Sequence, residues 1–192
     1  MGNRAANQTD WDRCLIALAA GDQEAFQKVY EEFYKPVFLL AVSLTGQVEM
    51  AEDVAQEVFL TVRSCAGSYE PRGQARAWIF GITKNVARYF WRRSRPEQEG
   101  DEALETIPTK GELEAGVLGN LLVSRALSEL SPAEYPVVVL HVFGGLSLRE
   151  IAEQYEIPYG TVLWRYGEAK KRLRRFFRRT DGEERRDLHE KI

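Results

Sequence analysis

Residues 131–177 read SPAEYPVVVLHVFGGLSLREIAEQYEIPYGTVLWRYGEAKKRLRRFF, and this stretch decides the fold of the C-terminal half. Ser147 and Glu150 have the spacing of a capping box, in which each side chain accepts a hydrogen bond from the other residue's backbone N–H. Apolar residues then recur at helical spacing. They are Leu148, Ile151, Ala152 and Tyr155. The pattern predicts a capped helix that begins just after Ser147.

A second helix follows after a short break. Pro158 disfavours α geometry at Ile157, so the first helix should end before it, and the next is expected to open near Gly160–Thr161. Its predicted apolar face consists of Val162, Tyr166, Ala169, Leu173 and Phe176 or Phe177. Two helices joined by such a turn are typical of the helix-turn-helix, which lays its second helix in a DNA major groove.

Positive charge is concentrated on this second helix. Residues 165–179 contain eight Lys or Arg and one acid, whereas the whole chain has a net charge of −3. A basic run alone is also typical of a solvated helix face. Because the run lies on and beyond a recognition helix, it favours binding to DNA phosphates.

The composition is that of a globular protein without a membrane span. It is 44% hydrophobic and 29% charged, and we find no convincing alternation of apolar and polar residues that would predict strands. The apolar stretch 36–44 is too short to span a bilayer, and the N-terminus has no apolar signal region, so we expect a cytoplasmic protein. Cys14 and Cys65 are better explained as small helix residues than as a redox switch. Together with His141 and His189 they do not have the spacing of a zinc-binding site. No metal or cofactor is expected.

The fold class predicted is all-α, with two small helical domains joined by a flexible linker. The first domain spans residues 10–96, with helices at 10–20 (Thr9 or Asp10 as cap), 23–45 (Asp22 as cap, Gly46 as stop), 48–65 and 75–95. Residues 97–117 hold seven acids and one base and are predicted to be the linker. The helix-turn-helix domain is expected at residues 118–178. Residues 179–192 are expected to form a charged tail.

Four stretches together resemble one family. They are AEDVAQEVFLTV at 51–62, ARAWIFGITKNVARYFWRR at 75–93, RALSELSPAEYPVVVLHVFGGLS at 125–147, and REIAEQYEIPYGTVLWRYGEAKKRLRR at 149–175. In this order and spacing they resemble regions 2 and 4 of bacterial RNA polymerase sigma factors of the extracytoplasmic-function (ECF) group. The resemblance covers about residues 22–178. It implies a non-enzymatic protein that directs core RNA polymerase to promoters by recognising −10 and −35 elements.

The resemblance also implies which residues act in region 2. The helix AEDVAQEVF resembles the surface that docks on the clamp helices of the polymerase β′ subunit. Its expected polymerase-binding residues are Asp53, Gln56, Glu57 and Phe59. The loop SYEPRG and the following helix resemble the −10 reader, in which a flipped base is held near an Asn. The expected −10 residues are Tyr69, Arg72, Asn85, Arg88, Arg92 and Arg93.

In region 4 the resemblance implies a −35 reader and contact with the polymerase β flap. The expected −35 residues are Arg149, Thr161, Trp164, Arg165, Glu168, Lys171 and Arg172. The implied partners are core RNA polymerase, promoter DNA and an anti-sigma factor, with no small-molecule substrate.

The chain departs from the family pattern at three places. Glu156 stands where a turn glycine is common and would be strained by about 1 kcal/mol in left-handed geometry. Pro136 should remove a backbone hydrogen bond from its helix. Leu163 and Trp164 replace residues that are usually polar or basic, which favours apolar contacts with thymine methyl groups.

Two other functions compete with this interpretation. A regulator with a sensor domain would need a sensing pocket or a phospho-acceptor fold in residues 1–96, but that half has helical periodicity and no strand–helix alternation. An enzyme would need a nucleophile–base pair, a phosphate-binding glycine loop or a metal set, and the sequence offers none of these. Dependence on core polymerase for promoter recognition would distinguish a sigma factor from a repressor.

Overall fold

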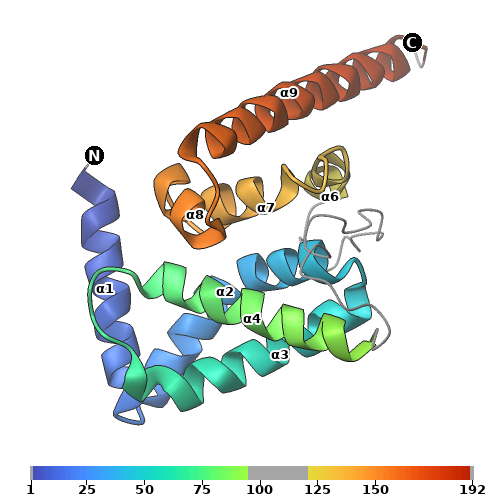
Figure 1. Cartoon of the computed structure of the whole chain (residues 1–192). Coiled ribbons are helices and arrows are strands. Elements are labelled where there is room, and N and C mark those ends of the chain that lie inside the picture. The colour runs from blue at the N-terminus through green and yellow to red at the C-terminus, as the bar shows by residue number, and fades with distance from the viewer. Residues whose placement is uncertain (1, 95–120, 191–192) are drawn as a thin grey trace.

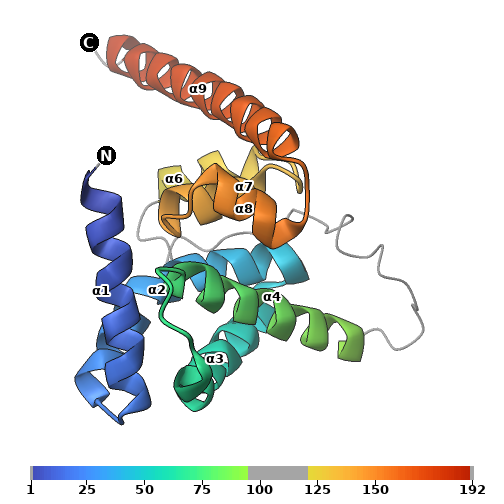
Figure 2. The same cartoon turned by 60° about the vertical axis from the view of Figure 1, so that its left-hand side comes forward.

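The computed structural model describes residues 2–94 and 121–190, and every regular element within these ranges is helical. Figure 1 shows two layers, with α1–α4 forming one and α6–α9 stacked on it. The same stacking is visible after a 60° turn, with α9 as the outermost helix (Figure 2). The two layers are called the N-terminal and the C-terminal module below. The expected linker, 97–117, lies outside the described residues.

The N-terminal module consists of α1 (Gly2–Ala19), α2 (Gln23–Thr45), α3 (Val48–Cys65) and α4 (Ala75–Ser94), with the short helix η1 (Ala66–Ser68) after α3. The Asp22 carboxylate caps α2 by accepting hydrogen bonds from the backbone N–H groups of Glu24 and Ala25, at 2.8 and 3.2 Å. Gly46 ends α2 in left-handed geometry, as the sequence predicted. The cap expected at Thr9 or Asp10 is wrong, because α1 already begins at Gly2.

The core of this module lies between α2, α3 and α4. Helical spacing predicts that Val54, Val58, Phe59 and Val62 of α3 face inward, and this is confirmed, since all four are buried. For α4, helical spacing predicts an apolar face of Trp78, Ile82, Val86 and Tyr89 or Phe90, and the structure displaces it. The fully buried residues of α4 include Ile79, Phe80 and Thr83, whereas the expected Trp78, Ile82 and Val86 are only half-buried and Tyr89 is exposed. The reason is that α4 contacts α1–α3 and also α8, so that it presents two neighbouring apolar faces.

The C-terminal module consists of α6 (Leu121–Ser128), α7 (Tyr135–Val138), the π-helical turn η3 (Val139–Phe143), α8 (Leu148–Tyr155) and α9 (Tyr159–Glu190). The capping box at the start of α8 is confirmed. Ser147 N–H donates to Glu150 Oε2 at 2.7 Å, and Glu150 N–H donates to Ser147 Oγ at 3.2 Å. Helices α8 and α9 form the predicted helix-turn-helix, and α9 continues as far as Glu190.

Pro136 removes no backbone hydrogen bond from its helix, contrary to the expectation. It lies in the first turn of α7, where a backbone N–H has no partner within the helix, so no hydrogen bond is lost. The preceding residues form a turn in which Ser131 N–H donates to the Glu134 carboxylate at 2.9 Å. Ser131, Pro132 and Glu134 have the spacing of a helix cap, an N1 proline and a capping-box acid, but α7 starts later, at Tyr135.

Glu156 adopts left-handed geometry in the turn between α8 and α9, with φ 55° and ψ 35°, so the condition under which it is strained is met. We expect Glu156→Gly to raise the free energy of unfolding by about 1 kcal/mol, because glycine adopts this geometry without a Cβ clash. Denaturant unfolding would measure the change. Glu156→Asn is the matched control, since asparagine tolerates left-handed geometry and removes the same charge. Destabilisation by both substitutions would show that the carboxylate matters more than the backbone.

The two modules are in direct contact. The guanidinium of Arg76 on α4 donates to the Gly144 carbonyl at 3.0 Å, and the Gln154 amide on α8 donates to the Ala77 carbonyl at 3.2 Å. Lys84 donates in return to the Gln154 carbonyl at 3.3 Å. A Cβ at Gly144 would lie 2.8 Å from the Phe80 ring, so only glycine allows the backbone to approach α4 this closely. None of the described helices is long and apolar enough to cross a membrane.

Candidate nucleic-acid and polymerase interfaces

The outer face of α3 is polar and open to solvent. Asp53, Gln56 and Glu57 are all exposed, opposite the buried valines. Leu60, one turn after Gln56, is 60% exposed although it is a large apolar residue. Sequence reasoning missed it, although an outward-facing Leu among polar residues was a readable signal. Leu60 adds apolar area to the same outer face as the acids and the amide, although a single exposed leucine is common on protein surfaces.

Phe59 does not belong to this surface. Its side chain is 3% exposed, and its ring packs against Tyr30 with 4.8 Å between centroids. The expectation that Phe59 contacts the polymerase is therefore corrected: it supports the outer face of α3 from the core. The helical period places residue 59 inward, next to Val58 and Val62.

The loop between η1 and α4 is held in place by Asp12 of α1. The Tyr69 hydroxyl donates to Asp12 Oδ1 at 2.5 Å, and Gly73 N–H donates to Oδ2 at 2.6 Å. Burial, together with the hydrogen bond to the carboxylate, raises the pKa of Tyr69 to about 12. Asp12 is buried, and sequence reasoning missed it because its partners lie 57 and 61 residues away. Tyr69 therefore stabilises the loop through its hydroxyl and offers only its ring to a base.

This loop lines a hollow whose opposite wall belongs to the other module. The hollow measures about 520 Å³ and is lined by Tyr69, Arg72 and Trp78 on one side and by Glu150 and Glu153 of α8 on the other. Arg72 is exposed and forms an ion pair with Glu70. Acidic side chains repel phosphate, so the hollow is unsuited to DNA while α8 covers it.

The remaining expected −10 residues lie farther along α4. Asn85 is exposed and does not line the hollow. Gly81, which lies one turn earlier on α4, does line it. Arg92 and Arg93 are exposed in the last turn of α4, while Arg88 is half-buried. The structure therefore does not bring Asn85 and the loop together in a closed pocket.

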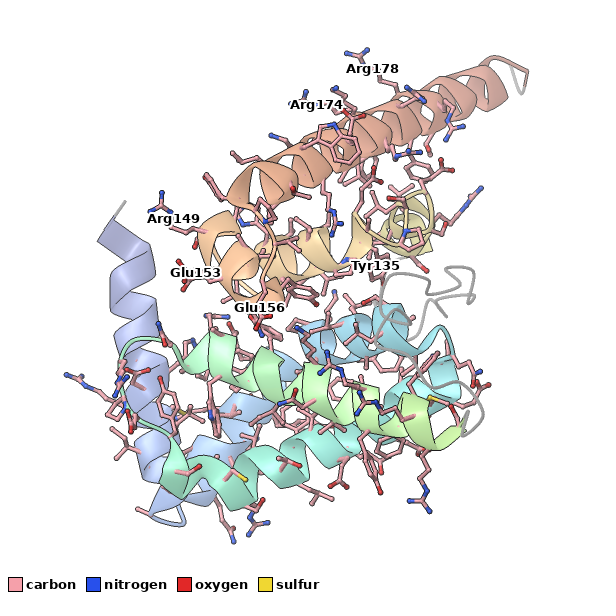
Figure 3. The ribbon with its side chains drawn as sticks, viewed as in Figure 1. Tyr135, Arg149, Glu153, Glu156, Arg174 and Arg178 are labelled. Atoms are coloured by element: carbon pink, nitrogen blue, oxygen red, sulfur yellow. The ribbon has the colours of Figure 1, made fainter. Side chains whose placement is uncertain are left out.

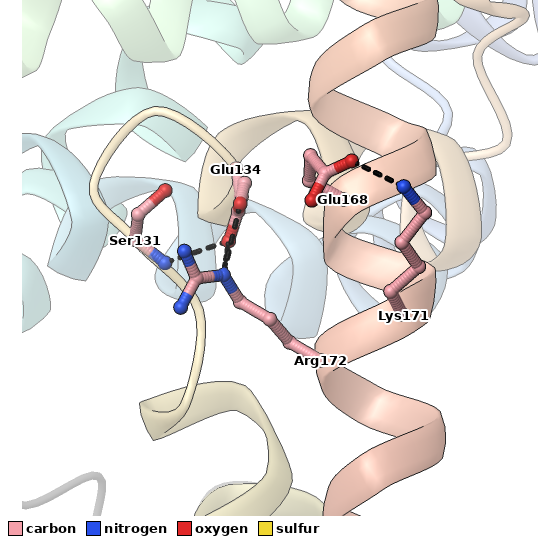
Figure 4. Close-up of polar contacts among 5 residues, drawn as sticks. All are labelled: Ser131, Glu134, Glu168, Lys171 and Arg172. Carbon is pink, nitrogen blue, oxygen red and sulfur yellow. Dashed lines mark hydrogen bonds and ion pairs between the residues drawn. The ribbon is translucent and has the colours of Figure 1, made fainter.

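The start of α9 carries an exposed apolar surface. Trp164 is 64% exposed and Leu163 44%, and the Thr161 side chain is half-buried. Arg149 of α8 lies over the ring of Tyr159, 5.6 Å from its centroid. Glu168, one turn beyond Trp164, accepts a hydrogen bond from Lys171 Nζ at 2.6 Å (Figure 4). This face is therefore an aromatic surface followed by an ion pair.

Two of the expected −35 residues have neighbours within the protein. Arg172 Nε donates to the buried Glu134 carboxylate at 3.1 Å, and the same carboxylate accepts from Ser131 N–H (Figure 4). Arg172 thus ties α9 to the start of α7. Arg165 lines a cavity between the modules, so its side chain lies on the side of α9 that meets the N-terminal module.

Farther along α9, basic residues share one face. Lys171, Arg174, Arg175 and Arg178 follow helical spacing, and together with Arg179 they line a shallow hollow of about 440 Å³. Arg174 and Arg178 point away from the rest of the molecule (Figure 3). Arg179 forms an ion pair with Glu129 at 2.9 Å. No group of three His, Cys, Asp or Glu side chains that could hold a metal ion occurs within the described ranges.

The chain matches two known protein-family models. Residues 29–97 match the family model of Sigma-70 region 2, and residues 120–173 match that of Sigma-70, region 4. The chain belongs to the sigma-70 family. It is an ECF-type sigma factor, which binds core RNA polymerase and directs promoter-specific transcription initiation through −10 and −35 elements.

Relatives and solved structures agree with this assignment. The chain is 29% identical to the ECF RNA polymerase sigma factor SigW of Bacillus subtilis, over 82% of this chain and 91% of the relative. It is 27% identical to the ECF sigma factor RpoE of Cereibacter sphaeroides, over 88% and 96% of the two chains. The fold resembles that of CnrH in complex with the cytosolic domain of CnrY, with a TM-score of 0.57 at 21% identity over 86% and 96% of the chains. It also resembles the sigma factor RpoE bound to the anti-sigma factor NepR from Bartonella quintana, with a TM-score of 0.57 at 21% identity over 80% and 96% of the chains.

Proposed function

We propose that the outer face of α3 is the polymerase contact and that α4 and α9 read the promoter. Asp53, Gln56 and Glu57 surround the exposed Leu60, so that face combines an apolar anchor with acids, which suit a protein partner and repel DNA. Asn85, Arg92 and Arg93 form an exposed polar face on α4, and Trp164 leads the recognition helix. The domain limits 10–96 and 118–178 correspond to these two readers.

We further propose that promoter binding requires the two modules to separate. The observation that supports this is the position of the readers: Arg88 and Arg165 line one cavity between the modules, and Glu150 and Glu153 of α8 cover the −10 loop. A DNA duplex is too large for that cavity, so its phosphates would not reach either arginine while the modules are docked. Binding to core polymerase would supply the free energy that separates the modules, so that free protein does not occupy promoters.

An anti-sigma factor is the expected inhibitor. One similar structure is that of a sigma factor bound to an anti-sigma factor, and the polymerase-binding and DNA-binding faces proposed above are accessible to such a partner. The protein is proposed to act without enzymatic activity and in the cytoplasm, where core polymerase is found.

Transcription from a promoter library tests the proposed function. Purified protein and core polymerase should produce specific run-off transcripts from a subset of a randomised promoter library, and protein alone should select no sequence. Absence of any specific transcript would contradict promoter recognition. Sequence-specific binding without polymerase would instead indicate a conventional repressor.

Asn85→Ala should relax the preference for one −10 base. Base contacts discriminate between sequences and phosphate contacts position the protein, so the expected loss is about 1–3 kcal/mol at a single base position. Arg92→Ala is the matched control on the same helix and should weaken binding to all promoters equally. Promoter-library transcription with each variant gives both results. An equal loss for every sequence with Asn85→Ala would remove Asn85 from base recognition.

The double variant Arg174→Ala with Arg178→Ala should weaken binding to all promoters to a similar degree. The slope of log K against log salt should fall by roughly two, because each lost phosphate contact releases about one fewer counterion. Holoenzyme binding to one promoter at several salt concentrations measures the slope. Arg13→Ala with Lys28→Ala removes the same charge from exposed positions of the N-terminal module and should leave the slope unchanged.

A further inference from the structure

The cavity between the two modules has the lining of a binding site for an anion. It measures about 450 Å³, which is within the usual range for sites of small organic ligands. Its charged walls are Lys84 and Arg88 from α4 and Arg165 from α9, opposed by one acid, Glu156. Both modules therefore contribute cations to one enclosed space.

Two hydrogen-bond donors at this cavity are buried without a partner. Arg88 Nε and the Tyr155 hydroxyl have no hydrogen-bond partner within the described part of the chain. A buried polar group without a partner is costly, and such groups in folded proteins call for an explanation. Both groups can donate and both residues line the cavity, so a shift of either side chain toward the cavity would let an acceptor oxygen of a ligand satisfy it.

Lys84 is partly buried and lies near a second cation, Arg88. Its ammonium group lies 5.0 Å from the centroid of the Tyr155 ring. Burial, together with the charge of Arg88, lowers the pKa of Lys84. A pKa lowered in this way means that the positive charge is disfavoured where it stands. An anion beside Lys84 and Arg88 would offset both the burial and the repulsion.

The rest of the lining is apolar. It consists of Leu44, Pro132, Ala133, Pro136, Val137, Ile151 and Ile157. A free inorganic anion would leave this surface unused, and a DNA duplex is far too large for the cavity. The lining therefore fits a compact molecule with an acidic group at one end and an apolar body at the other.

We propose that this cavity binds a small organic anion, a phosphate monoester or carboxylate attached to an apolar group, and that this ligand holds the two modules together. The ligand would occupy Arg88 and Arg165, two residues expected to contact promoter DNA, and would thereby oppose separation of the modules. The binding itself requires neither polymerase nor DNA, so it can be tested independently of the proposed function.

The test uses 1-naphthyl phosphate as the probe and isothermal titration calorimetry on the full chain. We expect saturable binding of one probe per protein and a higher melting temperature in its presence. The neutral 1-naphthol lacks the phosphate group and shows how much that group contributes to binding. Inorganic phosphate lacks the naphthyl ring and shows how much the apolar ring contributes. Each should bind at least about tenfold more weakly, which corresponds to one lost charge-assisted hydrogen bond or a comparable apolar contact.

Variants from both modules locate the site. Lys84→Gln and Arg165→Gln should each lower the affinity for the probe at least about tenfold. Lys28→Gln on α2 and Lys170→Gln on α9 are exposed matched controls and should leave its affinity unchanged. Circular dichroism and the melting temperature of each variant verify folding. No saturable binding, equal affinity for naphthol or for inorganic phosphate, or a loss confined to one module's variant would overturn the proposal.

Discussion

Asp53→Arg combined with Glu57→Arg should abolish binding to core RNA polymerase. The two carboxylates lie one turn apart on the exposed face of α3, opposite the buried valines. Charge reversal places cations against a surface that would be complementary to acids, at an expected cost of at least about 3 kcal/mol, or roughly 150-fold in Kd. Binding of fluorescently labelled protein to core enzyme measures the loss.

The control for this variant must change the same charge elsewhere in the same module. Glu24→Arg with Glu31→Arg does so on α2, where both acids are exposed. Both double variants should unfold at nearly the wild-type denaturant concentration, because exposed charges contribute little to stability. If the α3 variant bound core enzyme as wild type does, α3 would have to be regarded as an ordinary solvated helix face.

Arg76→Ala should destabilise the protein more than any other single substitution discussed above. The side chain is 7% exposed and donates to Glu32 Oε1 at 2.7 Å and to the Gly144 carbonyl. Its guanidinium also lies 5.2 Å from the centroid of the Phe33 ring. Loss of two charge-assisted hydrogen bonds and the ring contact should lower the free energy of unfolding by about 3 kcal/mol.

Arg76→Lys tests the geometry of this contact. A lysine keeps the charge but lacks the planar fork that reaches Glu32 and Gly144 together, so it should recover less than half of the lost stability. Glu32 is partly solvated, so its carboxylate is not left buried in either variant. Denaturant unfolding of the full chain measures both. Full recovery with lysine would mean that the charge alone, without bidentate geometry, holds the modules together.

The sequence predicted the helices well where local chemistry determines them. Asp22, Gly46 and the Ser147–Glu150 box act within four residues of their partners, and all three are confirmed. Left-handed geometry at Glu156 also follows from its place in the turn. Helical spacing was likewise sufficient to assign the buried face of α3.

The contacts that position the candidate site could not be read in this way. Arg76 occurs in the middle of a helix and would ordinarily be taken as solvated, but its partners are 44 and 68 residues away. Asp12 holds the loop between η1 and α4 across separations of 57 and 61 residues. Arg172 belonged to a basic run typical of DNA contacts, and only the fold reveals that Glu134 is its partner. Such contacts depend on how the two modules pack, which no local pattern encodes.

The distance between the modules, with and without core polymerase, tests the central claim most directly. Two spin labels would be placed at the exposed Cys65 on α3 and at Ser128→Cys on α6, in a Cys14→Ser background, and their separation measured by double electron–electron resonance. Docked modules predict one narrow distance in free protein and a longer one when core polymerase is bound. A broad distribution in free protein, or the same distance in both states, would contradict docking in the free protein and separation on the polymerase.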